Sequence, residues 1–144
     1  MQREQLKILL LQIRDDHKVR AEELESFARY SQLDVDQIDV LNVFDTPSFD
    51  SSVLQGYDAL YVGGASEANV LEPKIYPFVN DCISLIKFAG DTGIPTFASC
   101  FGFQLAVLAF GGEILSKDED YEMGSIPITL TNFCLLYTSP SPRD

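Results

Sequence analysis

The hydrophobic residues of the chain fall into four short apolar runs, separated by longer segments of mixed polarity. The first run, Leu6 to Leu11, is an almost continuous aliphatic stretch, which is typical of a strand buried on both faces. Three further runs, residues 37–44, 57–62 and 94–98, are bounded by Gly, Pro, Asp or Ser and also predict strands.

The spacing of apolar residues between these runs predicts three helices. The first lies within residues 12–31, where Leu24, Phe27 and Ala28 share one face. The second begins at Pro73, which suits a first helical turn, and is closed by Gly90 and Gly93. The third covers residues 100–110 and ends in two glycines. The apolar face of the second helix is formed by Ile75, Phe78, Val79, Cys82, Ile83 and Ile86.

Two short strands are predicted in the last part of the chain, at residues 113–115 and 125–131, with a charged turn between them. Pro127 places the second of these at a sheet edge or a bulge. The alternation of strands and helices predicts an α/β fold with a mainly parallel sheet. Ligands of such sheets gather at the carboxyl ends of the strands, so a site is expected from Gly63 onward and from Ser99 onward.

Composition fits one ordinary globular domain, because 144 residues with 46% hydrophobic and 22% charged residues can bury a single core. The net charge of −12 argues against nucleic acid and against an anionic membrane surface. Neither a targeting segment nor a stretch long enough to span a bilayer is expected, which makes the cytoplasm the default location.

The last eleven residues, 134–144, resemble the in-frame translation of a sequencing-library adapter. We therefore expect the native sequence to be residues 1–133, truncated there, and the domain to be incomplete at its C-terminus. Cys82 and Cys100 then remain as native cysteines. With one histidine and no CxxC pair in the chain, a metal site is not expected.

Cys100 is the residue that best fits a catalytic role. It stands between the predicted strand at 94–98 and the following helix, with small Ala98 and Gly102 two positions to either side. This is the steric pattern of a nucleophile elbow. A thiol at a helix N-terminus is favoured as the thiolate, and the N–H of Phe101 would face the carbonyl under attack.

The segment Ala98-Ser99-Cys100-Phe101-Gly102-Phe103-Gln104 resembles the G-x-C-x-G-x-Q pattern of class I glutamine amidotransferases, with Ala98 and Phe103 as departures. The segment Val62-Gly63-Gly64-Ala65-Ser66 resembles the oxyanion loop of that family, with Ala65 where proline is common. Glu122-Met123-Gly124 is similar to an E-x-G segment of members related to GMP synthase. The motifs follow in the family's order over residues 6–131.

The resemblance implies a flavodoxin-like three-layer sandwich and a glutaminase reaction. Cys100 would form a glutamyl thioester and release ammonia. The N–H groups of Gly64 and Phe101 would bind the oxyanion, and Gly63 and Gln104 would contact the substrate glutamine. No cofactor is implied, and a synthetase domain or subunit is the expected acceptor of the ammonia.

The resemblance also implies a histidine base and a glutamate two residues after it, both late in the domain. The only histidine in the chain is His17, which is expected to be a solvated loop residue. This chain is therefore expected to be inactive by itself. Cys82 lies on an apolar helix face and is expected to fill the core.

Two other functions stay open from the sequence. One is a related cysteine hydrolase, such as a γ-glutamyl hydrolase, although Gln104 favours the amidotransferase. The other is a non-catalytic binding or redox-sensing domain in which Cys100 is oxidised. Binding of FMN is disfavoured, because residues 12–17 do not form a phosphate loop after the first strand.

Overall fold

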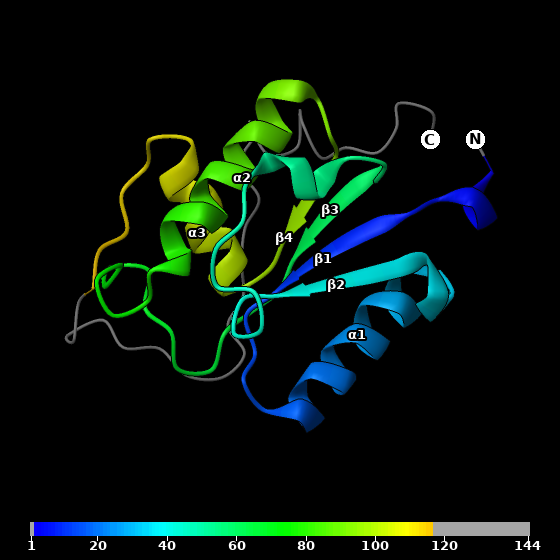
Figure 1. Ribbon diagram of the computed structural model, residues 1–144, viewed down its shortest axis with the longest axis horizontal. Coiled ribbons are helices and arrows are strands. Elements are labelled where there is room, and N and C mark those ends of the chain that lie inside the picture. The colour runs from blue at the N-terminus through cyan, green and yellow to red at the C-terminus, as the bar shows by residue number, and fades with distance from the viewer. Residues whose placement is uncertain (1, 117–144) are drawn as a thin grey trace, which may run out of the picture. The chain divides into compact units, whose positions relative to one another are not determined.

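A computed structural model describes residues 2–116 of the chain, which contain four strands and three α-helices (Figure 1). The strands are β1 (Ile8–Gln12), β2 (Ile38–Asn42), β3 (Ala59–Val62) and β4 (Thr96–Ala98). The α-helices are α1 (His17–Ser31), α2 (Phe78–Thr92) and α3 (Phe101–Ala109). Three short 3₁₀ helices lie at Arg3–Gln5, Val35–Gln37 and Ser51–Leu54.

The four strands form one parallel sheet in the order β2-β1-β3-β4. Ile8 in β1 is paired with Ile38 on one side and with Ala59 on the other, and β4 joins β3 through Leu60 and Thr96. The chain order therefore reverses between β1 and β3. The carboxyl ends of two such strands diverge into a crevice, which is the usual place for a ligand in an open α/β sheet.

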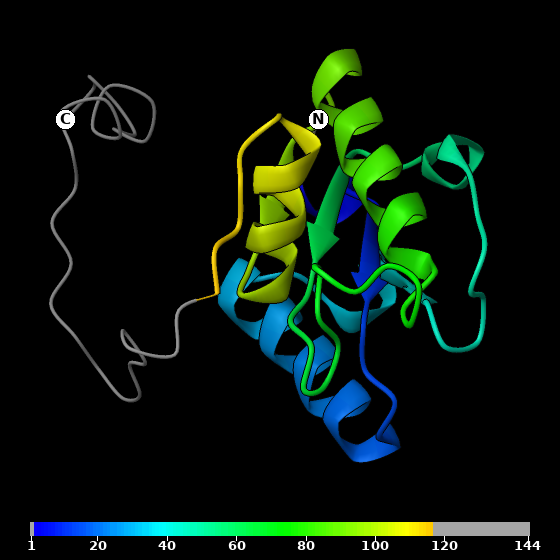
Figure 2. The same ribbon diagram turned by 90° about the vertical axis from the view of Figure 1, so that its left-hand side faces the viewer.

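Helices cover both faces of the sheet: α1 lies on one face, and α2 and α3 lie on the other (Figure 1, Figure 2). The α1 side buries Ile8, Leu10, Ala28 and Ile38. The opposite side holds the larger core, in which the buried faces of α2 and α3 meet Leu9 and Leu11. All five residues of β1 are buried, which the apolar run predicts for Ile8 to Leu11 but not for polar Gln12. The predicted flavodoxin-like α/β sandwich is confirmed for Met1–Ile114, which form one compact unit.

Helix α1 begins where its sequence provides a cap. The Asp16 side chain accepts hydrogen bonds from the N–H groups of Lys18 (2.8 Å) and Val19 (3.0 Å), and these are donors that a helix leaves without intrahelical partners. The helix ends at Gln32, which adopts a left-handed conformation with φ of 56°. His17 is exposed as expected, but it is the first residue of this helix rather than part of a loop.

The predicted start of the second helix was wrong. Helix α2 begins at Phe78 with Pro77 as its N-cap, so Pro73 and Ile75 precede it and Ile75 is exposed. The reason is the second proline: Pro77 cannot donate a backbone hydrogen bond, and it disfavours a helical conformation at the residue before it. Gly93 closes the helix with φ of 77°, whereas Gly90 lies inside it.

The strand predicted at residues 113–115 was also wrong. In the part of the chain that the structure describes, β4 pairs only with β3, and no strand lies beside residues 113–115 to form a ladder with them. The predicted turn at 117–121, the strand at 125–131, the Glu122–Gly124 segment and the tail at 134–144 lie outside the described residues. Within residues 2–116, no helix combines the length and the apolar character needed to cross a membrane.

Candidate active site

The corner between β4 and α3 holds Cys100 in an unusual backbone conformation. Cys100 is the N-cap of α3, with φ of 54° and ψ of −113°, and its side chain is exposed. A positive φ is uncommon for a residue other than glycine and persists only where the surrounding structure enforces it. Here the N–H of Ser99 donates to the Val62 carbonyl (3.0 Å), and the N–H of Gly102 donates to the Gly63 carbonyl (3.0 Å). These bonds fix the corner against the end of β3.

Gly102 is the residue that lets α3 approach β3 so closely. A Cβ at this position would lie 2.6 Å from the backbone oxygen of Val62 and 2.8 Å from Val62 Cγ1. Real Cβ atoms do not come this near to backbone, and this backbone oxygen cannot swing aside as a flexible side chain can. The requirement for a small residue after the nucleophile therefore has a direct steric cause.

The structure brings Gly64 next to Cys100, as the two motifs predict. A Cβ built on Gly64 would lie 3.4 Å from Cys100 Cβ. The preceding residue, Gly63, is held in place by its N–H bond to the Leu11 carbonyl (3.0 Å) and by the bond that its own carbonyl accepts from Gly102. The loop after β3 and the corner after β4 are thus one hydrogen-bonded assembly.

The N–H of Gly64, predicted to bind an oxyanion, already has a partner here. It donates to Glu23 Oε2 at 3.2 Å. The Glu23 side chain is only 9% exposed and comes from the middle of α1. An oxyanion would have to replace this carboxylate as the acceptor, because a single N–H makes one strong hydrogen bond at a time.

A polar network beneath the crevice contains the residues that sequence reasoning missed. Arg14 Nε is paired with Glu23 Oε2 (2.9 Å), and Arg14 Nη1 donates to Ser66 Oγ (3.0 Å). Buried Gln12 and Asn42 are linked to each other (3.1 Å) and to the backbone carbonyls of Arg20 and Arg14. One signal pointed to this network: Arg14 follows a fully buried strand almost directly, at the edge where parallel sheets bind ligands.

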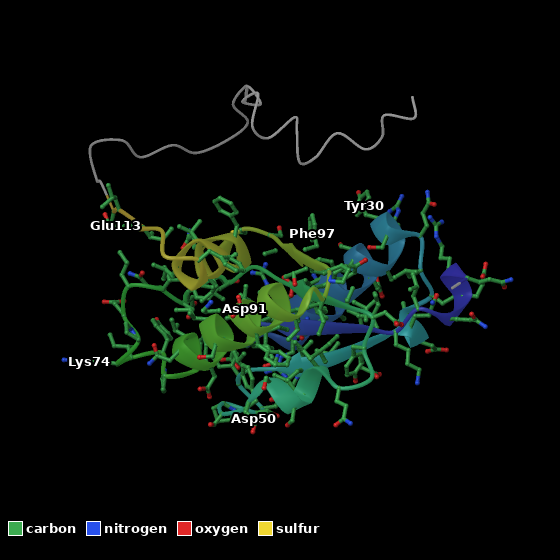
Figure 3. All side chains as sticks on the ribbon, turned by 90° about the horizontal axis from the view of Figure 1, so that it is seen from above. Tyr30, Asp50, Lys74, Asp91, Phe97 and Glu113 are labelled. Atoms are coloured by element: carbon green, nitrogen blue, oxygen red, sulfur yellow. The ribbon has the colours of Figure 1, made fainter. Side chains whose placement is uncertain are left out.

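Cys100 lines a cavity of about 680 Å³ that is bounded by α1 and by the ends of β3 and β4. Gly64, Ser99, Arg14 and Glu23 also contribute to its wall. Much of the remaining wall is aromatic and comes from Phe27, Tyr30, Tyr61 and Phe97. Phe27 stacks on Tyr61, and Phe97 meets both rings edge-on. Figure 3 shows Phe97 and Tyr30 on one side of the molecule, opposite Asp50.

The other predicted site residues take different positions. Gly63, Phe101 and Gln104 do not line this cavity; Phe101 is buried, and its N–H belongs to the first turn of α3. The N–H of Gln104 donates to the Cys100 carbonyl (3.2 Å). His17 faces other surface hollows, away from Cys100. Among the residues described, the structure therefore joins Cys100 and Gly64 but brings no histidine to the thiol.

Cys82 has the opposite environment to Cys100. It is fully buried in the larger core, as its place on the apolar face of α2 predicts. Burial raises the pKa of the Cys82 thiol far above its usual range, and the neighbouring Asp81 carboxylate raises it further. The thiol is consequently neutral at physiological pH and serves as an apolar side chain.

Comparison with known proteins finds a family model and solved structures that are similar to this chain. The model of the family "Glutamine amidotransferase class-I" matches residues 32–143, which include the Gly63–Gly64 loop and Cys100. A crystal structure of a glutamine amidotransferase from Thermotoga maritima has a TM-score of 0.55 and 21% sequence identity, and the match covers 74% of this chain. It covers 43% of that chain, so the present sequence spans less than half of that protein. At this identity the likeness concerns the fold. No curated protein sequence matches significantly.

Proposed function

The chain belongs to the class I glutamine amidotransferases, and we propose that Cys100 is the nucleophile that attacks the side-chain amide of glutamine and cleaves its C–N bond. The observation that carries the proposal is the conformation of Cys100: exposed, at the N-terminus of a helix, and beside the glycine loop after β3. This arrangement presents the Cys100 side chain to a cavity, next to Gly64 and to the first turn of α3, whose N–H groups could bind an oxyanion. Both features are what acyl transfer to a thiol requires.

The proposed reaction has two steps. The Cys100 thiolate attacks the amide carbon, the C–N bond breaks, and ammonia leaves after taking up a proton, so that a glutamyl thioester remains. Water then attacks the thioester carbon, the C–S bond breaks, glutamate leaves, and the Cys100 sulfur takes up the proton that the water loses. The Phe101 N–H, in the first turn of α3, would stabilise the oxyanion in both steps, together with Gly64 once it exchanges its bond with Glu23. Family resemblance suggests a synthetase domain or subunit as the user of the ammonia.

The proposal assigns no base within this chain. The only histidine, His17, is exposed at the start of α1 and does not line the cavity of Cys100. A positioned base contributes about 10²–10⁴-fold to such a step. We expect this chain by itself to form the acyl bond slowly with an activated substrate, and not to turn over glutamine.

The test uses the diazoketone analogue of L-glutamine, which alkylates an active-site thiol. Mass spectrometry should find one adduct per chain, on Cys100, with none on Cys82 and none in the Cys100→Ala variant. Glutamate release from glutamine by the chain itself should stay at background. An adduct on another residue, or no adduct with a folded chain, would refute the assignment of the nucleophile.

A further inference from the structure

We propose that Arg14 determines the specificity of this site by binding the α-carboxylate of the substrate while Cys100 attacks the side-chain amide. The inference rests on the proposed function, and it adds a residue outside the motifs that relate the chain to its family. Arg14 lies two residues beyond β1, in the crevice where the chain order of the sheet reverses. Its side chain lines the same cavity as Cys100.

The guanidinium of Arg14 lies close to Cys100. Arg14 Nη2 and Cys100 Cβ flank the same glycine: a Cβ built on Gly64 would lie 2.7 Å from the former and 3.4 Å from the latter. No side chain at position 64 separates the guanidinium from the nucleophile. In an extended glutamine, the amide carbon and the carboxylate oxygens are roughly 5–6 Å apart, as standard bond lengths dictate. One glutamine molecule can therefore reach both groups.

Hydrogen bonds hold the guanidinium of Arg14 in one orientation. Its Nε is bonded to Glu23 and its Nη1 to Ser66, so two of its three nitrogens are fixed. Among residues 2–116, no acceptor is bonded to Nη2, the nitrogen that lies against Gly64. The side chain is 20% exposed, which leaves it accessible from the cavity. A planar cation oriented in this way is suited to a carboxylate, which accepts hydrogen bonds from guanidinium nitrogens in one plane.

The cavity contains few charged side chains. The charged residues that line the cavity are Arg14, Glu22 and Glu23, and much of the rest of its wall is aromatic. Arg14 is thus the single cation among the described residues of the wall. The Glu23 carboxylate is paired with Arg14 and holds it in place. Glu22 is 60% exposed on α1, in a long, solvent-exposed ion pair with Lys18 (3.7 Å), and an ammonium group could share its carboxylate. The guanidinium of Arg14 and this carboxylate match the two α-groups of a free amino acid, which carries both charges.

The experiment compares the rates at which three reagents alkylate Cys100 in the 144-residue chain and its variants. The reagents are the diazoketone analogue of L-glutamine, the same analogue with its α-carboxylate converted to an amide, and iodoacetamide, which has no α-groups. Arg14→Gln should slow labelling by the first reagent about 10- to 100-fold, as expected for losing hydrogen bonds to a charged group. The rates of the other two reagents should fall much less, and by a common factor, because the variant also leaves the buried Glu23 carboxylate without its partner.

Arg20→Gln is the matched control. Arg20 is also an arginine with a mostly buried side chain in an ion pair, to Asp45 (2.7 Å), but it does not line the cavity of Cys100. Its Nε donates to the Arg14 carbonyl (2.8 Å), so this variant also tests whether a disturbed backbone at Arg14 is enough to change recognition. The loss of Arg20 should not alter the preference between the two diazoketones. If Arg14→Gln slowed iodoacetamide as much as it slowed the glutamine analogue, recognition of the α-carboxylate would be overturned, and Arg14 would be assigned an effect on the thiol itself. Equal rates of reaction of Arg14→Gln and wild type with the glutamine analogue would also refute the role of Arg14. Failure of the wild type to react with the glutamine analogue would refute the proposed function instead.

Discussion

The two cysteines of the described fold belong to neighbouring helices, since Cys82 lies in α2 and Cys100 is the N-cap of α3, which packs against α2, and their surroundings differ in almost every respect. Cys82 lies within α2, where regular helix and close packing bury its sulfur completely. Cys100 precedes α3 in a strained conformation, with its side chain exposed beside a cavity. The same thiol is thus an apolar filler in one place and a candidate nucleophile in the other. Backbone position and access, rather than residue type, set the chemistry.

The largest expected effect is a difference in reactivity between the two cysteines. Near neutral pH, iodoacetamide should modify Cys100 at least about 10³-fold faster than Cys82, because burial suppresses the Cys82 thiolate and each pKa unit is worth a factor of ten. Peptide-level mass spectrometry of the folded chain gives the two rates. In denaturant the ratio should fall to near one. Equal rates in the folded chain would remove the contrast altogether.

A smaller effect is expected from filling the space behind the nucleophile. Gly102→Val should reduce the free energy of unfolding by about 1–3 kcal/mol or more, because its Cβ would meet the Val62 backbone. It should also slow the alkylation of Cys100, since the corner must shift. Chemical denaturation and labelling rates measure the two effects.

Gly90→Ala provides the control for Gly102. Its Cβ would also meet an atom at 2.5 Å, but that atom belongs to the ring of Phe110, an exposed side chain that can rotate away. Alanine inside a helix is favoured over glycine by roughly 0.5–1 kcal/mol, so this variant should be neutral or more stable. If both substitutions destabilised the chain equally, the steric explanation for Gly102 would fail.

The smallest expected effect is a dependence on alkaline pH that originates at Cys82. Its pKa is raised in the folded state, so above about pH 9 the unfolded chain loses a proton that the folded chain retains. Stability from this group is complete below that pH and falls as the pH rises, by at most about 1.4 kcal/mol per pH unit. Cys82→Ala should show a shallower decline in stability between pH 9 and 10.5. A parallel decline in both proteins would contradict the prediction.

The sequence predicted those features that depend on local pattern. The apolar run of β1 shows that this strand is buried, and the small residues around Cys100 show that the corner is tight. Both requirements act within a few residues of the chain. The start of α2 was missed because Pro73 also suits a first helical turn, whereas a helix begun there would have to run through Pro77, so α2 starts after Pro77. The strand at 113–115 was predicted wrongly because a local apolar pattern does not show whether another strand lies beside it, and none of the described strands does.

The polar part of the candidate site could not be read from sequence. Glu23 approaches Gly64 across 41 positions in the chain, because α1 folds back over the sheet and turns this side chain toward the end of β3. On the helix surface, Glu22 and Glu23 are equally acidic neighbours, and nothing in their spacing shows which of them is buried. The pairing depends on how α1 sits on the sheet, which is set by the apolar side chains of its other face.

The order of the strands has a consequence for how the site comes into being during folding. β1 and β2 are joined by a single helical crossover, so they can associate from residues 8–42 alone. The nucleophile corner also needs β3 to dock on β1, where paired residues such as Ile8 and Ala59 are 51 positions apart, against 30 for Ile8 and Ile38. It then needs β4 to dock on β3, where Leu60 and Thr96 are 36 positions apart. Arg14, Gly64 and Cys100 therefore meet only after the most distant contacts have formed. On a ribosome, the reactive thiol would take its place only after β1, β2 and β3 have left the ribosome and can fold against one another.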